Sequence, residues 1–364
     1  MIKAIAAVTE SADTPFTVCD IELEDPQDYE VLVRIKGVGI CHTDLSFKKI
    51  GHYAPGVLGH EGAGVVEKVG AAVTRLVPGD HVVLSYFACH HCETCLDGHP
   101  AYCDNMEAAN ISGGRVDGST PIKINGKPGK GSFFYQSSFA NYAISHENNT
   151  VKIDKTLPVA LMGPLGCGLQ TGAGAVINAL KVGENQGIAI FGLGAVGLAA
   201  VMASKISGAN PIIVVDIVPE KLELAKQLGA THIINGATSD AVSEIKRISE
   251  GGVAFSLECV GVPKLLEQAV ESLRPTGVCG LLGMSSTEAT ASIKLLDLLG
   301  GRTVKGIIEG DADPQEFIPK LIEFYRSGQF PFDKLLKTYP LEDINIAIDD
   351  MKNGLVVKPV LIPS

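Results

Sequence analysis

A glycine-rich turn between an apolar strand and a helix constrains the fold of this chain more than any other feature. The segment 192–197 reads GLGAVG, directly follows the apolar run 188–191 and opens the helical stretch 195–207. In this context the first glycine permits a tight turn, the second lets the backbone approach a pyrophosphate, and the third lets helix and strand pack closely. The pattern predicts a dinucleotide site at the start of a helix, where free N–H groups face phosphate. The alternative is a tight turn that binds nothing.

Strand-like and helix-like segments alternate along the second half of the chain. The predicted strands there are 188–191, 212–216, 232–234, 254–258 and 277–282, with a helix at 219–228 that has Pro219 in its first turn. This alternation predicts a parallel sheet with helices on both faces. Residues 1–165 instead contain β-branched runs such as 62–70 and 81–84, and residues 104–132 have the composition of a long surface loop. Beyond residue 303, a helix at 314–327 and a terminal strand at 356–362 are expected.

An acidic residue at the end of the second predicted strand indicates which dinucleotide is bound. Asp216 would accept hydrogen bonds from the adenosine ribose and would repel a 2′-phosphate, and no arginine follows it at 217–219. We therefore predict NAD rather than NADP. The residues assigned to this cofactor site are Gly192, Gly194, Ala195, Val196, Gly197, Asp216 and Lys221.

Four cysteines lie close together at Cys89, Cys92, Cys95 and Cys103. Four thiolates bind zinc tetrahedrally, and short C-x2-C steps deliver neighbouring ligands. A disulfide pair or an iron–sulfur cluster would be the alternative. A zinc site with four cysteines has no open position, so it would hold a loop and perform no chemistry. The histidines within the segment 89–103 are expected to face solvent.

Three more residues stand out, namely Cys41 in GICHTD, His60 in GHEGAG and Cys167 in GPLGCGLQTG. Two thiolates and one imidazole would form a zinc site with an open fourth position, the arrangement of catalytic zinc. Each residue alone is equally consistent with a buried core position. Sequence spacing does not show that the three converge.

Several long motifs together resemble the zinc-dependent medium-chain alcohol dehydrogenases. They are GHEGAGVVEKVG at 59–70, the four-cysteine spacing, GCGLQTGAG at 166–174 and GLGAVG at 192–197. The resemblance covers essentially the whole chain, and residues 301–335 are most similar to the aryl-alcohol (benzyl-alcohol) dehydrogenases within that family.

The resemblance implies an α/β fold of two domains. A GroES-like, mainly-β catalytic domain with both zinc sites would comprise residues 1–167 and 304–364, and a Rossmann domain with a doubly wound parallel sheet would comprise residues 168–303. Two zinc ions per chain and NAD would be the cofactors. The reaction would interconvert a primary alcohol, aromatic or allylic, and its aldehyde by hydride transfer. The alternatives are an aldehyde reductase of secondary metabolism and a homologue that binds metal and nucleotide without catalysis.

The same resemblance implies roles for residues around the catalytic zinc. Cys41, His60 and Cys167 match its ligands. Asp44 matches a carboxylate that orients the histidine ligand, and Glu61 matches a carboxylate that assists ligand exchange.

A proton path and cofactor cations are implied as well. Thr43 matches the hydroxyl that takes the proton of the alcohol, while His42 and Lys358 match cations near the pyrophosphate. Ser46 stands where many members have a histidine that passes the proton to solvent, so the path ends in water or uses His52. The substrate pocket is expected to include Ile50, Ser85, Phe133 and Phe134.

Charge and hydropathy restrict the partners of the chain. A net charge of −11 makes nucleic acid and anionic membranes poor partners. The longest apolar run, 187–203, is interrupted by glycines and is shorter than the ~20 residues of a membrane span. The first ten residues lack the apolar core of a signal peptide, so we expect a cytoplasmic protein. The family resemblance implies a homodimer or homotetramer, and the long loop at 104–132 favours the dimer.

Overall fold

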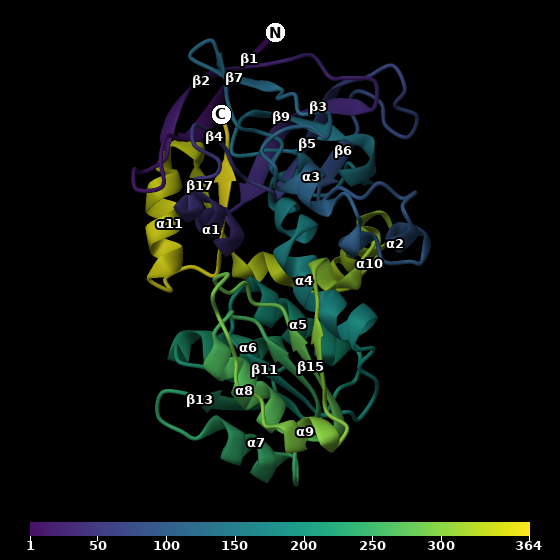
Figure 1. Ribbon diagram of the computed structural model, residues 1–364, viewed down its shortest axis with the longest axis vertical. Helices are drawn as coiled ribbons and strands as arrows, with labels where there is room; N and C mark the ends of the chain where they lie inside the picture. The colour runs from purple at the N-terminus through teal and green to yellow at the C-terminus, as the bar shows by residue number, and fades with distance from the viewer. The chain divides into compact units, whose positions relative to one another are not determined.

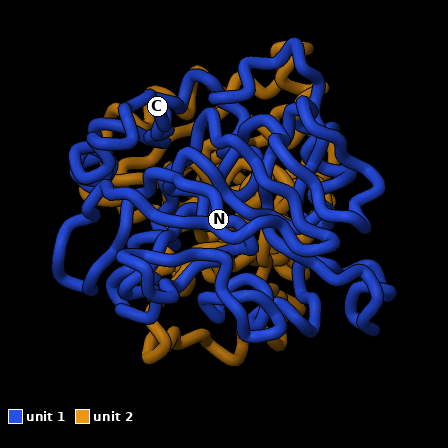
Figure 2. Tube along the Cα trace, turned by 90° about the horizontal axis from the view of Figure 1, so that it is seen from above, with its two compact units in different colours: residues 1–167, 313–321, 333–364 blue, residues 168–312, 322–332 orange.

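The computed structural model describes residues 1–364 (Figure 1). The chain divides into two compact units (Figure 2). Unit 1 comprises residues 1–167, 313–321 and 333–364, and unit 2 comprises residues 168–312 and 322–332. The chain therefore leaves unit 1 after Cys167 and returns to it near its C-terminus.

Unit 1 is built on two largely antiparallel sheets. A five-stranded sheet has the order β4-β1-β2-β7-β8, and a seven-stranded sheet has the order β10-β6-β5-β3-β18-β17, with β9 also paired to β3. The strands are β1 (Ile2–Thr9), β2 (Thr17–Leu23), β3 (Glu30–Gly39), β4 (Gly56–Val57), β5 (Gly62–Val69), β6 (His81–Leu84), β7 (Ile122–Ile124), β8 (Lys127–Pro128), β9 (Tyr142–His146), β10 (Thr150–Ile153), β17 (Leu336–Pro340) and β18 (Lys358–Ile362). The helices of unit 1 are α1 (His42–Ile50), α2 (Glu93–Leu96), α3 (Met106–Asn110) and α11 (Ile344–Lys352). Helix α10 (Pro314–Arg326) begins in unit 1 and ends in unit 2.

Strand β3 lies at the centre of the larger sheet, where it pairs with β5, β9 and β18. Val31, Val33 and Ile35 are fully or almost fully buried, and Leu32 on the opposite face of the strand is also only 4% exposed. Packing therefore covers both faces of β3 here, because successive side chains of a strand point to opposite faces.

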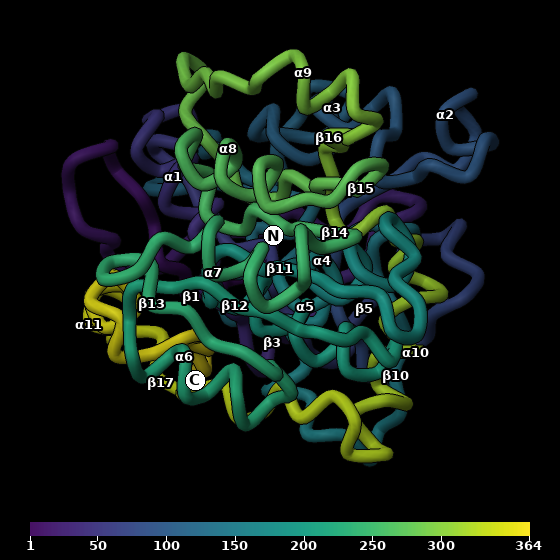
Figure 3. The backbone as a smooth tube through the Cα atoms, turned by 90° about the horizontal axis from the view of Figure 1, so that it is seen from below, coloured from purple at the N-terminus to yellow at the C-terminus, as the bar shows by residue number.

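Unit 2 contains a six-stranded, all-parallel sheet. Its order is β13-β12-β11-β14-β15-β16, and Figure 3 shows these strands one after another across the unit. The strands are β11 (Ile188–Phe191), β12 (Ile212–Asp216), β13 (His232–Asn235), β14 (Val253–Glu258), β15 (Leu273–Leu281) and β16 (Thr303–Gly306). The helices are α4 (Gly168–Gly174), α5 (Ala195–Ile206), α6 (Pro219–Leu228), α7 (Ala241–Ile248), α8 (Pro263–Glu271) and α9 (Leu295–Leu299).

Helices cover both faces of this sheet. Ala189 and Phe191 pack in one core cluster with Ile245 of α7 and Leu266 of α8. Ile190 points to the opposite face, where its side chain lies beside the start of α5. The predicted parallel sheet with helices on both faces is therefore confirmed. No helix of the chain combines the length and the apolar character that a membrane span requires.

Two expectations from the sequence need correction. Residues 104–132 form more than a surface loop, because β7 within them pairs with β2 and Arg115 is buried. The guanidinium of Arg115 donates hydrogen bonds to the carboxylates of Glu30 and Glu24. A composition typical of loops cannot reveal such a buried ion pair, because the acidic partners lie far away in the sequence.

The second domain boundary also differs from the predicted one after residue 303. Residues 304–312 and 322–332 group with unit 2. The reason is that β16 forms an edge of the parallel sheet, and Glu309 accepts a hydrogen bond from the side-chain amide of Gln170 at 2.9 Å.

Candidate metal centres and dinucleotide site

Unit 1 brings Cys41, His60, Glu61 and Cys167 together. One potential ligand atom of each residue lies within 4.8 Å of those of the others. Cys41 immediately precedes α1, His60 and Glu61 immediately precede β5, and Cys167 ends a 3-10 turn. The three residues that the sequence could not show to converge therefore do converge, and a carboxylate joins them.

A single buried carboxylate orients the histidine of this cluster. Asp44 Oδ1 accepts hydrogen bonds from His60 Nδ1 at 2.8 Å and from Gly59 N at 3.0 Å, and its Oδ2 accepts one from Cys41 N at 2.9 Å. Asp44 and His60 are fully buried. Because Nδ1 is held by Asp44, the other ring nitrogen, Nε2, is the atom that faces the sulfur atoms.

The donor set fits a zinc ion. His60 Nε2 is buried and has no hydrogen-bond partner, which is costly for a polar atom unless a metal uses its lone pair. Two thiolates and one imidazole are ligands that zinc prefers, and a carboxylate oxygen of Glu61 lies within 4.8 Å of their donor atoms.

Glu61 and Lys358 form a buried ion pair beside the sulfur atoms. Lys358 Nζ donates to Glu61 Oε1 at 2.8 Å and to the carbonyl of Ile40 at 3.0 Å. Burial raises the pKa of the Glu61 carboxyl to about 7, although Lys358 opposes this effect. Burial alone would lower the pKa of Lys358, but the Glu61 carboxylate raises it above its usual value, so the ammonium stays charged. The expectation of a cation free to bind pyrophosphate at Lys358 is thereby corrected, because its ammonium is buried and bonded within unit 1.

Two aromatic residues expected in the substrate pocket lie against the histidine of the cluster. The ring of Phe134 stacks on His60 at a centroid distance of 4.6 Å, and the ring of Phe133 meets His60 edge-on at 5.3 Å. Phe133 is fully buried, whereas Phe134 is 9% exposed. Of the other two expected pocket residues, one is buried and one is exposed. Ser85 is fully buried and its hydroxyl donates to the carbonyl of Gly166 at 2.6 Å, whereas Ile50 ends α1 with 68% of its surface exposed.

The residues expected to carry a proton from the alcohol to solvent do not form a continuous chain of hydrogen bonds. Thr43 Oγ1 lies 3.6 Å from Cys41 Sγ, next to the cluster. His52 is exposed, and its Nε2 is hydrogen-bonded to the carbonyl of Ser112 at 2.9 Å. No hydrogen bond joins His52 to Thr43. His42 is exposed at the start of α1.

A second metal-type cluster in unit 1 consists of Cys89, Cys92, Cys95 and Cys103, whose sulfur atoms all lie within 4.8 Å of one another. The N–H of Cys92 donates to Cys89 Sγ at 3.3 Å, and the N–H of Cys89 donates to Cys103 Sγ at 3.4 Å. Burial raises the pKa of the Cys89 thiol, but backbone N–H groups outweigh burial and lower it to about 6. The four cysteines are not joined by disulfides. The histidines at 90, 91 and 99 are exposed, as predicted.

The glycine-rich turn of unit 2 has the geometry of a phosphate cradle. A Cβ at Gly194 would meet no atom within 4 Å, so the backbone there is open to a ligand. A Cβ at Gly197 would lie 1.9 Å from the carbonyl oxygen of Gly192, so only glycine allows the helix this close to the turn. Helix α5 begins at Ala195, and no side chain caps it. These features fit a dinucleotide pyrophosphate.

Asp216 ends β12 beside this turn. Its Oδ2 accepts from Leu193 N at 2.7 Å, and its Oδ1 accepts from the N–H groups of Ile217 and Val218. The carboxylate is thus fixed next to the turn, where the second ribose of a dinucleotide would bring its hydroxyls. Lys221 lies in the first turn of α6 and is partly buried.

Sequence reasoning missed one residue of the metal site, Gln136. It is buried, and its side-chain amide contacts the backbone on both sides of Glu61. No motif contains it, because glutamine is not a metal ligand of the type sought. Its only sequence signal is its place two residues after Phe134.

Comparisons with known proteins were consistent over the whole chain. Residues 27–155 match a family model described as an alcohol dehydrogenase GroES-like domain, and residues 195–327 match one described as a zinc-binding dehydrogenase. Geraniol dehydrogenase of Castellaniella defragrans is 44% identical over 99% of this chain and 98% of its own length.

Solved structures agree with these matches. An alcohol dehydrogenase zinc-binding domain protein from Burkholderia ambifaria is 48% identical, with a TM-score of 0.97 over 99% of both chains. Benzyl alcohol dehydrogenase from Acinetobacter calcoaceticus is 46% identical, with a TM-score of 0.96 over 100% of both chains.

Removing the carboxylate of Asp44 should weaken metal binding at His60. In Asp44→Ala the imidazole loses its orienting partner, and we expect zinc affinity at this site to fall by about 10- to 100-fold. Competition with a chromogenic chelator measures the change. Asp20→Ala, which removes an exposed carboxylate from β2, is the control and should bind zinc normally. Equal zinc affinity in both variants would contradict the role of Asp44.

Proposed function

Because this chain belongs to the zinc-binding alcohol dehydrogenase family, we propose that it is an NAD-dependent enzyme that interconverts allylic or aromatic primary alcohols and their aldehydes. The observation that carries this proposal is the convergence of Cys41, His60, Glu61 and Cys167 beside Thr43 in unit 1. A relative that is named geraniol dehydrogenase and a similar structure named benzyl alcohol dehydrogenase support the substrate class. The family also settles the fold class, a GroES-like domain with a Rossmann domain, as predicted from the sequence.

The side chains of unit 1 have distinct roles in this reaction. Bound zinc supplies Lewis acidity that lowers the pKa of an alcohol, and bound NAD supplies the hydride acceptor. Thr43 holds its hydroxyl next to Cys41 and takes the proton that the alcohol releases. The ring of Phe134, which stacks on His60 and is 9% exposed, would contact an unsaturated or aromatic group of the substrate. Phe133 is fully buried and packs edge-on against Phe134. Glu61 stays within reach of the ligand atoms and assists exchange of the incoming oxygen.

We propose two zinc ions per chain with different tasks. Cys41, His60 and Cys167 would hold the one that takes part in catalysis. Cys89, Cys92, Cys95 and Cys103 would hold the other, which would fix the loop around α2. Nine cysteines, six of them assigned to zinc and none in a disulfide, are typical of a reducing compartment, which supports a cytoplasmic location.

We further propose that the protein forms a homodimer through unit 2. Strand β16 is an edge of the parallel sheet, and the preceding helix α9 exposes Leu295, Leu296 and Leu299 with 81%, 77% and 83% of their surfaces accessible. An apolar cluster next to an open sheet edge is costly to leave in water and is typical of an interface.

The proposed activity is tested by following NADH formation with geraniol, cinnamyl alcohol, benzyl alcohol and ethanol. We expect the first three to give kcat/KM values at least about 100-fold above ethanol, because burial of their apolar groups beside Phe134 stabilises the complex by roughly 25 cal/mol per Å². Faster turnover of ethanol, or reaction of aldehydes only, would overturn the substrate class.

Variants of Thr43 serve as matched controls in the same assay. Thr43→Ala should lower kcat by about 10²- to 10⁴-fold while the zinc content is unchanged, because the proton acceptor is lost. Thr43→Ser keeps the hydroxyl and should restore most of the rate. An unchanged kcat in Thr43→Ala would remove this residue from the mechanism.

The cofactor preference should depend on the charge of Asp216. Asp216→Gly removes the repulsion of a 2′-phosphate, so the ratio of kcat/KM for NAD to that for NADP should fall by at least about 10-fold. Asp240→Asn is the control, because Asp240 also accepts backbone hydrogen bonds in unit 2 but at the start of α7. A wild-type protein that already prefers NADP would show that the assignment to NAD is wrong.

The dimer should depend on the leucines of α9. The double variant Leu295→Glu/Leu299→Glu places charges in the apolar cluster and should yield monomers by light scattering coupled to size-exclusion chromatography. Leu355→Glu, at a leucine of unit 1 that is 72% exposed, should leave the wild-type dimer intact. If the double variant still elutes as a dimer, this surface is not the interface.

A further inference from the structure

Residues 132–138, here named the clamp turn, have an unusual backbone next to the metal cluster. Ser132, Phe134, Tyr135 and Ser137 have φ angles of 56°, 50°, 53° and 49°. Four residues with side chains in the left-handed region within one short segment are uncommon, and such conformations persist only where the surroundings hold them. The hydrogen bonds of the clamp turn therefore indicate which neighbouring residues it holds in place.

Backbone and hydroxyl bonds fix the clamp turn to the segment that leads to His60. Ser137 Oγ donates to the carbonyl of Val57 at 2.7 Å and accepts from Phe133 N at 3.0 Å. The N–H of Ser138 donates to the carbonyl of Gly59 at 2.9 Å.

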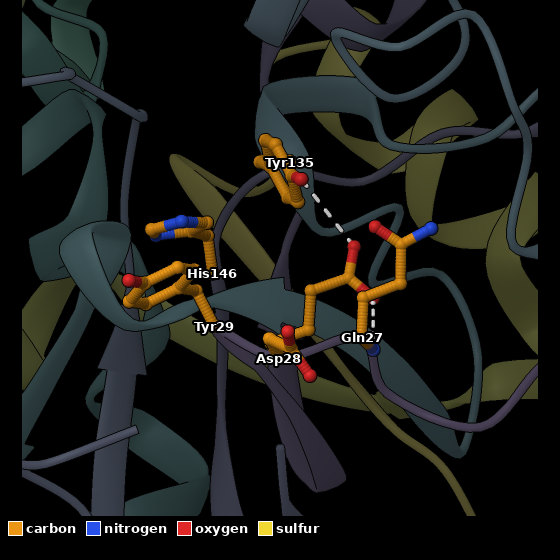
Figure 4. A pocket seen from close by; sticks show the side chains of 6 residues that line it. Gln27, Asp28, Tyr29, Tyr135 and His146 are labelled. Atoms are coloured by element: carbon orange, nitrogen blue, oxygen red, sulfur yellow. Dashed lines mark hydrogen bonds between the residues drawn. The ribbon is translucent and has the colours of Figure 1, made fainter. Parts of the chain in front are cut away.

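The opposite side of the clamp turn is anchored by a buried charge. The hydroxyl of Tyr135 donates to Glu30 Oε1 at 3.3 Å, and Figure 4 shows this bond at the wall of a cavity of about 480 Å³. Glu30 is in turn paired with the buried guanidinium of Arg115. Gln136 therefore lies between two anchored neighbours, Tyr135 on one side and Ser137 on the other.

Gln136 itself is 2% exposed and uses both ends of its amide. Its Nε2 donates to the carbonyls of His60 at 3.0 Å and Ser85 at 3.1 Å. Its Oε1 accepts from Gly62 N at 3.0 Å and from Ser138 Oγ at 2.9 Å. The amide is thus hydrogen-bonded to the backbone of the residue immediately before Glu61 and of the residue immediately after it.

The same amide is linked to the segment that carries Cys167. Ser85, whose carbonyl accepts from Gln136, donates its own hydroxyl to the carbonyl of Gly166 at 2.6 Å. Two buried side chains, those of Gln136 and Ser85, therefore connect the segment of the imidazole and the carboxylate with the segment of one thiolate. None of these bonds involves the atoms that would bind a metal.

We propose that Gln136 is a positioning residue of the metal site, which fixes the backbone on both sides of Glu61 and so sets the placement of His60 and Glu61 relative to Cys167. This inference rests on the proposed function only in that the cluster binds a metal. It predicts that loss of the amide changes the geometry around the metal and loosens the metal, even where the protein stays folded.

The test uses the full-length protein loaded with Co²⁺ in place of zinc, because the visible bands of cobalt report ligand geometry without any need for activity. Bands that disappear in Cys167→Ala belong to this cluster and not to the four-cysteine site. Gln136→Met keeps the length of the side chain and loses all four hydrogen bonds. We expect shifted bands and release of cobalt to a chelator at least about tenfold faster than in the wild type.

Two further variants keep the result interpretable. Asn345→Ala removes an amide that likewise grips a backbone N–H and carbonyl, those of Phe16, away from the cluster, and it should leave the bands and the release rate unchanged. If Gln136→Met does not fold, Gln136→Glu is measured instead, since its carboxylate still accepts from Gly62 and Ser138 but no longer donates to His60.

The outcomes separate this inference from the proposed function. Unchanged bands and an unchanged release rate in folded Gln136 variants would overturn the positioning role, even if their melting temperature falls. Cobalt bands of the wild type that Cys167→Ala does not alter would instead overturn the metal assignment itself and, with it, this inference. A fall in kcat of Gln136→Met with an unchanged KM for NAD would support a local effect at the metal.

Discussion

The candidate metal centre depends on the hydrogen bonds that the buried carboxylate of Asp44 accepts. The carboxylate accepts hydrogen bonds from the imidazole of His60 and from the backbone of Cys41 and Gly59, so one side chain joins the start of α1 to the segment before β5. A buried carboxylate is stable only when its lone pairs are used, and here three N–H groups use them. The same bonds leave Nε2 of His60 facing the thiols. The hydrogen bonds that stabilise the buried Asp44 carboxylate are therefore the same bonds that orient His60.

Close approach of the backbone is the second constraint, and it explains the positions of particular glycines. A Cβ at Gly39 would lie 2.0 Å from Glu61 Oε2, and a Cβ at Gly197 would lie 1.9 Å from the carbonyl of Gly192. The first approach leaves room for the carboxylate beside the metal cluster, and the second brings a helix start to the cradle for a pyrophosphate. At both sites the missing side chain of a glycine allows a close approach, of the Glu61 carboxylate to Gly39 and of the Gly192 carbonyl to Gly197.

The secondary structure of unit 2 was largely predictable from local pattern. Strands β11 and β12 and helix α6 have the predicted bounds, since each is a short run with its own start and stop residues. Local pattern failed where partners are distant in the sequence. Arg115 lies in a segment with the composition of a loop, yet it is buried by acidic residues of β3 and its neighbours. Lys358 is held by Glu61, almost three hundred residues earlier, so its buried ion pair had no sequence signal.

The sequence by itself determined the parallel sheet, the glycine-rich turn, the four-cysteine cluster and, through several long motifs, the family. These features depend on spacing within short segments, where residue type and geometry are tightly coupled. Only the tertiary structure decided that Cys41, His60 and Cys167 meet, that Glu61 joins them, and that Gln136 bonds the backbone on both sides of Glu61. Convergence of distant segments follows from how strands and turns pack, and packing is a property of the whole fold that no single segment encodes.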